Sequence, residues 1–199
     1  MIICEGPDGA GKTNLISTLS KDLMIPVHKR ASSPTGGPVE NLWEWAYEDV
    51  TTMHRQRFQI YDRHPLISEY IYGPITREGM DERFFSTEAV DLCRLFHDSV
   101  IVVFCDPGVL EVEKNVVGPA APPHMPGVTD NWRRIYYSYR ALMTHWDGNL
   151  MTWDYRYMAL YPYIRSLCVN FMLIKFAKRP QKINLFKNGC VAIKKESLG

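Results

Sequence analysis

The chain opens on a short apolar run followed at once by Gly6-Pro7-Asp8-Gly9-Ala10-Gly11-Lys12-Thr13, a complete Gly-x-x-x-x-Gly-Lys-Thr string. An amphipathic helical pattern comes next, so the string stands in the strand-to-helix context that a phosphate-binding loop requires. Glycines let consecutive backbone N–H groups converge on phosphate oxygens, and the following helix directs the positive end of its dipole at them. We therefore expect the chain to bind a nucleoside triphosphate.

Two side chains complete this loop. Lys12 is a compact point charge that can bridge the β- and γ-phosphates, and the Thr13 hydroxyl can enter the octahedral shell of Mg²⁺. Phosphate-binding loops serve motors, switches and transferases alike, so the loop alone does not name the reaction.

The composition limits the class of protein. A chain of 199 residues is long enough for one sizeable core, and 23 Lys and Arg against 22 Asp and Glu give a net charge of only +1. This balance does not favour nucleic acid or an anionic membrane, so we expect small ligands. The cysteines are odd in number and lack a Cys-x-x-Cys pair, which indicates reduced thiols and a cytoplasmic location: Cys4, Cys93, Cys105, Cys168 and Cys190. We see no secretion or membrane-spanning signal.

Short apolar runs alternate with helical patterns along the chain. We expect strands at residues 1–5, 25–29, 57–62, 99–105 and 150–153, and helices at 11–23, 40–55, 65–72, 86–97, 107–116, 130–146 and 155–177. This alternation predicts an α/β fold with a parallel sheet covered on both faces, whose ligands gather beyond the carboxyl ends of the strands. The residues expected along that rim are Gly6, the segment after His28, Asp62, Arg63, Asp106 and Asp154.

Two segments rich in Pro and Gly interrupt the alternation, at residues 31–38 and 117–127. Because long loops in a compact domain are usually functional, we interpret both as movable covers of the rim, with disorder as the alternative. From residue 178 the chain becomes cationic, and we interpret 178–199 as a basic tail. The alternative is an arm that reaches phosphate or a partner.

The pair Asp62-Arg63 stands at the end of the third expected strand, where the phosphates of a loop-bound nucleotide would lie. The carboxylate can hold Mg²⁺, while the planar guanidinium can span donor and acceptor oxygens as charge spreads in the transition state. A surface ion pair is the alternative. We expect Lys12, Asp62 and Arg63 to be the catalytic residues, and Thr13 and Asp62 to hold the metal.

Residues 5–13 together with Asp62-Arg63 resemble the thymidylate kinase family of nucleoside monophosphate kinases. Residues 62–69, and 125–128 with Asn131, are similar to bacteriophage-encoded members, which would place the protein in a host cytoplasm. The resemblance covers about residues 1–175. It implies a five-stranded P-loop kinase fold over 1–177 with a short lid at about 117–129, ATP as donor, Mg²⁺, a deoxynucleoside monophosphate as acceptor, and a homodimer.

The resemblance also implies roles for individual residues. The expected ATP-binding residues are Gly6, Asp8, Gly9, Ala10, Gly11, Lys12, Thr13, Asn14 and, beside the donor adenine, Asp154. The expected acceptor-binding residues are Asp8, Arg30, Arg63, His64, Tyr70, Tyr72 and Arg134. Alternatives remain open, because Asp8 suits an ordinary turn, His64 could cap the strand end, the two tyrosines could be core residues, and Asp154 could cap a helix.

The chain departs from the family at one position of consequence. Members supply a second arginine from the phosphate loop or the lid, whereas Gly9 and Ala10 occupy the loop here and residues 117–129 contain neither Arg nor Lys. The nearest substitutes are Lys114, Arg133 and Arg134, although helix-surface charges are usually only solvated.

These patterns favour an enzyme that transfers the γ-phosphoryl group of ATP to dTMP or another deoxynucleoside monophosphate. Such an acceptor needs no general base, because its phosphate is already ionised. The alternatives are a deoxynucleoside kinase, a nucleotide-dependent switch or motor, and a non-catalytic nucleotide-binding relative. No Asn-Lys-x-Asp string and no apolar strand ending in Asp-Glu supports the switch or motor.

Overall fold

A computed structural model describes residues 1–28, 39, 41–52, 58–77, 79 and 82–177. Arg30, the Pro- and Gly-rich segment 31–38, Cys190 and the expected basic tail lie outside the described residues. No helix in the described part of the chain is long and apolar enough to cross a membrane.

The described residues form a five-stranded sheet in the order β2-β3-β1-β4-β5, and every pair of neighbouring strands is parallel. The strands are β1 (Ile2–Glu5), β2 (Val27–His28), β3 (Ile60–Asp62), β4 (Ile101–Cys105) and β5 (Asn149–Trp153). In the central strand, Ile3 lies opposite Tyr61 on one side and Val102 on the other. The expected α/β class and five-stranded parallel sheet are confirmed.

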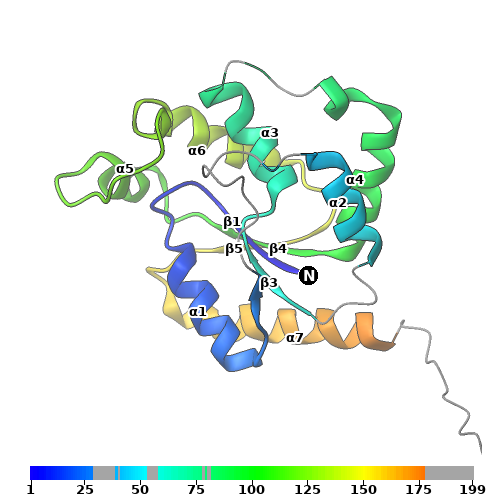
Figure 1. The fold of residues 1–199 in the computed structure, drawn as a ribbon. Coiled ribbons are helices and arrows are strands. Elements are labelled where there is room, and N and C mark those ends of the chain that lie inside the picture. Colours follow the sequence, from blue (N-terminus) through cyan, green and yellow to red (C-terminus); the bar gives the residue numbers. More distant parts are fainter. Residues whose placement is uncertain (29–38, 40, 53–57, 78, 80–81, 178–199) are drawn as a thin grey trace, which may run out of the picture.

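Helices cover both faces of the sheet (Figure 1). They are α1 (Lys12–Leu23), α2 (Leu42–Thr52), α3 (Pro65–Thr76), α4 (Thr87–Ser99), α5 (Val109–Val117), α6 (Val128–Thr144) and α7 (Tyr161–Ala177), with 3₁₀ turns at Glu82–Phe85 and Met158–Leu160. Figure 1 shows α1 and α7 together on one side of the sheet, and α2, α3, α4 and α6 on the other.

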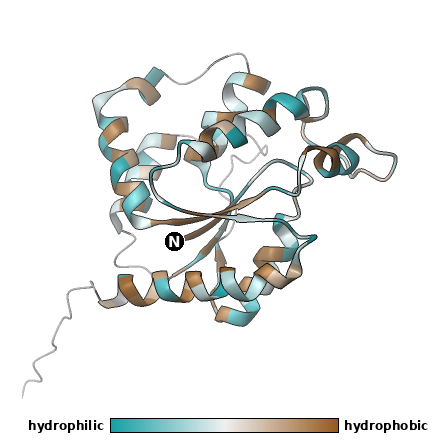
Figure 2. Cartoon of the chain, turned by 180° about the vertical axis from the view of Figure 1, so that it is seen from behind, coloured by the Kyte–Doolittle hydropathy of each residue, from teal (hydrophilic) through white to brown (hydrophobic). Residues whose placement is uncertain are grey.

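Alternate residues of β1 supply the two halves of the core. Ile2 and Cys4 pack with residues of α1 and α7, whereas Met1 and Ile3 pack with residues of the helices on the opposite face. This is the period-two alternation of a strand buried on both faces. The central strands are correspondingly apolar, while the helices around them carry both polar and apolar residues (Figure 2).

Two helix boundaries differ from the sequence expectation by four residues or more. The last helix does not begin at residue 155: a 3₁₀ turn comes first and α7 begins at Tyr161, which places Pro162 in the first turn, where its missing N–H costs no hydrogen bond. The third helix does not end at residue 72 but continues through Pro74 to Thr76. Ile75, in that added turn, packs against the core, so tertiary contact outweighs the local cost of the proline.

Candidate phosphate-binding site

The phosphate-binding loop leaves β1 with a backbone that only glycine adopts easily. Gly6 has φ 141°, and a Cβ there would lie 2.5 Å from the backbone oxygen of Cys105 on β4. Gly11 has φ 81°, and its Cβ would lie 2.6 Å from Cδ1 of Tyr155. The end of β4 and Tyr155 therefore lie so close to the loop that only glycine fits at these two positions.

Lys12 begins α1 and turns its side chain back into the loop. Its Nζ donates hydrogen bonds to the backbone oxygens of Gly6, at 2.9 Å, and Pro7, at 2.6 Å. Burial, together with the positive charge of Arg63, lowers the pKa of Lys12 to about 8. An ammonium bound only to neutral carbonyls gains more from an anion, so a phosphate entering the loop offers it a stronger partner.

Arg63 follows β3 and reaches across to the same loop. Its Nη2 lies 2.9 Å from Oδ1 of Asp8 and 3.4 Å from the oxygen of Gly6. The other oxygen of Asp8 accepts a hydrogen bond of 2.7 Å from the Tyr72 hydroxyl on α3, and the guanidinium lies 5.1 Å from the centre of the Tyr72 ring. These contacts fix the guanidinium in one orientation before any ligand arrives.

The charges of this cluster set the protonation state of Asp8. Burial alone would raise the pKa of its carboxyl, but the nearby Arg63 and Lys12 charges and the Tyr72 hydrogen bond hold that pKa well below the usual value. Arg63 itself is only 7% exposed, and its Nε has no hydrogen-bond partner among the described residues. A buried donor without an acceptor is costly, so an oxygen supplied by a ligand would complete the arrangement.

The loop and Arg63 line one hollow of about 520 Å³. Its walls come from the phosphate loop, the end of β3, the end of α5 and the segment after α5, and consist of Asp8, Gly9, Ala10, Gly11, Lys12, Thr13, Asp62, Arg63, Lys114, Asn115, Ala120 and Pro122. In Figure 1 the loop before α1 and the segment after α5 lie on the same side of the molecule. The structure thus brings together the loop, the Asp62-Arg63 pair and part of the expected lid.

Thr13 and Asp62 both line this hollow, which makes them suitable for Mg²⁺. Magnesium takes few protein ligands and completes its octahedron with water and phosphate oxygens. The hydroxyl and carboxylate fit that requirement. No cluster of three or more Asp, Glu, His or Cys residues that could form an all-protein cage occurs in the described part of the chain.

His64 lies in the core instead of facing the hollow. It is 0% exposed, its Nε2 is 3.3 Å from Oδ2 of Asp49 on α2, and its Nδ1 accepts the backbone N–H of Leu66 at 3.3 Å. Burial lowers the pKa of its imidazole, which favours the neutral ring. His64 is thus the N-terminal cap of α3.

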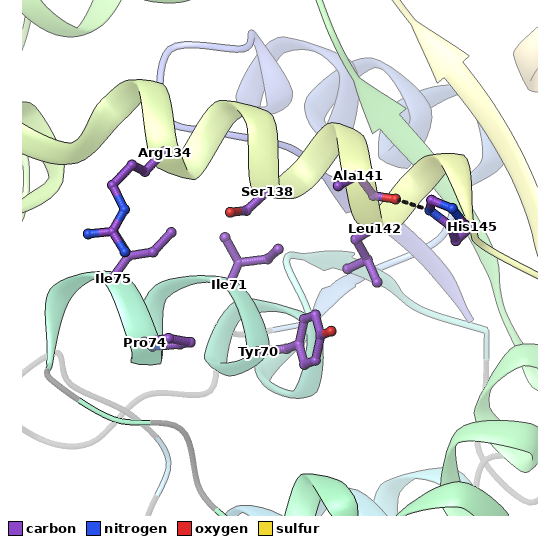
Figure 3. Close-up of a pocket in the computed structure, with 9 residues that line it drawn as sticks. All are labelled: Tyr70, Ile71, Pro74, Ile75, Arg134, Ser138, Ala141, Leu142 and His145. Carbon is purple, nitrogen blue, oxygen red and sulfur yellow. Dashed lines mark hydrogen bonds between the residues drawn. The ribbon is translucent and has the colours of Figure 1, made fainter.

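Tyr70 and Arg134 line a second hollow of about 480 Å³ between α3 and α6 (Figure 3). Its other lining residues are Ile71, Pro74, Ile75, Ser138, Ala141, Leu142 and His145, and none belongs to the phosphate loop. The structure therefore separates these two expected acceptor residues from the phosphate hollow, whereas Tyr72, on the same helix as Tyr70, contacts Asp8.

The remaining expected residues lie at the start of α1 and directly after β4 and β5. Asn14 is exposed in the first turn of α1, and Asp154 is engaged by Arg156, whose guanidinium donates to it at 2.6 Å. The Arg156 hydrogen bond lowers the pKa of Asp154. Asp106 accepts hydrogen bonds from Tyr136 and from the backbone of Gly108.

Two residues that sequence reasoning missed hold the loop from the lid side. The side-chain amide of Asn115, on α5, donates to the backbone oxygen of Gly9 at 2.8 Å and to the hydroxyl of Tyr155 at 3.2 Å. Tyr155 in turn donates to Glu111 at 2.9 Å. Nothing in the sequence signals Asn115, while the position of Tyr155 directly after the rim residue Asp154 was an available hint.

The three cations considered as substitutes for a lid arginine have different surroundings. Lys114 lines the phosphate hollow, is 73% exposed, and lies 4.0 Å from Oε2 of Glu111. Arg133 instead pairs with Glu113 at 2.9 Å and covers the ring of Trp132. With Arg134 in the second hollow, Lys114 alone of the three lines the hollow of the phosphate loop.

Comparison with known proteins finds likeness in structure. No family model and no curated protein matches the chain. Among solved structures, it is similar to the YorR protein of Bacillus subtilis in complex with phosphorylated GDP, at 20% identity and a TM-score of 0.59, covering 88% of this chain and 97% of that one. It is also similar to deoxyadenosine kinase from M. mycoides with dCMP and dCDP or with dATP, at 15% and 13% identity, TM-score 0.49 in each case, covering 87% and 86% of this chain and 98% of that one. At such identities the likeness shows a shared fold, that of YorR.

Proposed function

We propose that this chain is an ATP- and Mg²⁺-dependent kinase that transfers the γ-phosphoryl group to the phosphate of a deoxynucleoside 5′-monophosphate, dTMP or a related nucleotide. The observation that carries this proposal is the position of Arg63. Its buried guanidinium, whose Nε has no hydrogen-bond partner in the part of the chain that the structure describes, lines the same hollow as Lys12 and the phosphate loop. A fixed cation beside a phosphate cradle is what phosphoryl transfer requires.

The state of Asp8 favours a phosphate acceptor over a hydroxyl. A hydroxyl acceptor needs a base, and in the described part of the chain the carboxylates that line the hollow are Asp8 and Asp62. Asp8 is a poor base, because Arg63 and Tyr72 occupy its oxygens and its pKa lies well below the usual value. Asp62 is expected to serve the metal. An acceptor that arrives already ionised needs neither of them as a base.

Several residues that line the hollow have roles of their own in this proposal. The loop N–H groups and Lys12 hold the β- and γ-phosphates of the donor, and Arg63 spans the transferring group and the acceptor phosphate while Asp8 keeps it oriented. Thr13 and Asp62 would hold Mg²⁺, which, when bound, neutralises charge on the phosphate oxygens. Lys114 supplies a further positive charge from the lid side, and the segment after α5 excludes water.

The experiment is a transfer assay with ATP labelled at the γ-phosphate and a panel of deoxynucleosides and their monophosphates, with products separated by thin-layer chromatography. We expect labelled diphosphate from at least one monophosphate, and none from Lys12→Ala. Lys21→Ala, which removes an exposed lysine from the last turn of the same helix, should leave transfer unchanged. Labelled monophosphates made from nucleosides, or release of phosphate without any acceptor, would contradict the proposal.

A further inference from the structure

Arg63 has an unusual backbone. Its φ is 65°, in the left-handed region that a residue with a long side chain rarely adopts. Such a conformation persists only where the surroundings impose it, and it occurs preferentially at functional sites. Here it turns the chain between the end of β3 and the start of α3 and directs the guanidinium toward the phosphate loop.

The peptide that follows Arg63 is held by a buried carboxylate. The backbone N–H of His64 donates to Oε1 of Glu5 at 2.6 Å, and the Tyr139 hydroxyl on α6 donates to Oε2 at 3.1 Å. Glu5 is 0% exposed and is the last residue of β1, directly before Gly6 of the loop. One side chain therefore connects the start of the phosphate loop to the turn that carries Arg63.

Burying a carboxylate is costly, and an apolar residue at the end of a central strand would be cheaper. Burial raises the pKa of Glu5 to about 7, although the His64 N–H and the charges of Arg63 and Lys12 act in the opposite direction. An oxygen acceptor that reaches the His64 N–H is what this position supplies and a Leu or Val would not. The side chain at position 5 must therefore be long enough to bring an oxygen to the His64 N–H, whether or not it is charged.

We propose that Glu5 is a positioning residue for Arg63: its side-chain oxygen fixes the Arg63–His64 peptide in the left-handed turn from which the guanidinium reaches the phosphate hollow. This inference rests on the proposed function, because it assigns Arg63 to the transferring phosphoryl group. It predicts that length and an acceptor oxygen matter at position 5, and that negative charge does not.

Asp49 provides a matched control within the same cluster. It is also a buried carboxylate that contacts His64, but it does so at the ring, 3.3 Å from Nε2, and it accepts the Tyr61 hydroxyl at 2.9 Å. It holds the side chain of His64 and leaves the peptide after Arg63 untouched. Asp49→Asn should therefore perturb stability without acting on Arg63.

The test compares two variants that separate reach from charge. Glu5→Gln keeps the length and an oxygen acceptor, and we expect its kcat to stay within about threefold of the wild type. Glu5→Asp keeps the charge but is one methylene too short, and we expect kcat to fall about 30-fold while KM for ATP changes less than about threefold. Asp49→Asn should keep kcat within about threefold of the wild type, even if it lowers Tm as much as Glu5→Asp does. The reverse order, with Glu5→Asp active and Glu5→Gln impaired, would overturn the proposal.

A second arm asks whether Glu5 acts through Arg63. In an Arg63→Ala background, Glu5→Asp should lower kcat less than about twofold further, because the group that it positions is gone. A full additional loss there would mean a merely structural role and would overturn the proposal.

A third measurement needs no turnover and so separates this inference from the proposed function. The Nε–H resonance of Arg63, assigned in ¹⁵N-arginine-labelled protein by its absence from Arg63→Ala, should shift in Glu5→Asp and stay in place in Glu5→Gln and Asp49→Asn. If no monophosphate is phosphorylated by the wild type, this pattern still supports the positioning role, and an unmoved resonance in Glu5→Asp would contradict it.

Discussion

The guanidinium of Arg63 lies 2.9 Å from the carboxylate of Asp8, which connects the end of β3 to the middle of the phosphate-binding loop. The pair is 55 residues apart in the chain and largely buried. An arginine held in this way keeps its planar donors oriented without a ligand, so little reorganisation is needed when phosphate oxygens enter.

Replacement of this guanidinium should slow the chemical step. We expect Arg63→Ala to lower kcat about 100-fold and to raise KM for ATP by much less, because the guanidinium gains most where charge spreads in the transition state. Arg63→Lys should not restore the rate, since a point charge cannot span two phosphates. Steady-state kinetics with both substrates measure this. Arg77→Ala, which removes an arginine paired with Glu69 on α3, is the control, and an unchanged kcat in Arg63→Ala would contradict the role of Arg63.

The hydroxyl of Tyr72 should matter for the acceptor and not for ATP. Tyr72→Phe removes the 2.7 Å hydrogen bond to Asp8 and leaves the ring beneath Arg63 in place. Asp8 then loses one of the two partners that orient it, and we expect KM for the monophosphate to rise roughly three- to tenfold while KM for ATP stays within about twofold. Tyr163→Phe, on the exposed side of α7, should change neither constant. A rise in KM for ATP alone would place Asp8 on the donor side.

A lysine on α5 should contribute the charge that the lid itself lacks. Lys114 lines the phosphate hollow, so we expect Lys114→Ala to lower kcat roughly tenfold and to weaken binding of ATP more than that of AMP. Arg133→Ala is the matched control, because it removes a cation that also lies beside the expected lid, on α6, but pairs with Glu113. Nucleotide affinities from calorimetry, combined with kcat, test both variants. Equal effects of the two substitutions would mean that Lys114 has no specific role and that only the overall positive charge near the lid affects nucleotide binding.

The parts of this structure that sequence predicts well are those set by local pattern. Gly6, Gly11 and Lys12 belong to a motif that occurs between a strand and a helix. They therefore predicted β1, the loop and α1 together. The five strands were also predicted near their observed positions along the chain, because their apolar runs are short and separated by helical patterns.

The residues of the acceptor side were harder to predict, because their positions depend on contacts with residues that are distant in the sequence. His64 follows Arg63 directly, yet its ring lies in the core, because its Nε2 forms a hydrogen bond with Asp49 on α2 there. Tyr70 and Tyr72 were both expected beside the acceptor, but α3 presents Tyr70 to the second hollow and Tyr72 to Asp8. Glu5 stood within the recognised motif, but its role appears only once β3 brings the peptide of His64 beside it.

The buried carboxyl group of Glu5 should make stability depend on pH. Burial raises its pKa from 4.5 to about 7, so between these values the folded protein keeps a proton that the unfolded chain has released. The free energy of unfolding therefore falls as pH rises through that window and then levels off above it. Glu5→Gln has no such proton, and its stability relative to the wild type should increase by about 1 to 3 kcal/mol from pH 5 to pH 8. Urea unfolding of both proteins at several pH values measures the difference, with the exposed-site variant Glu48→Gln as the control. A difference that stays constant with pH would mean that Glu5 is ionised in the folded protein throughout this range.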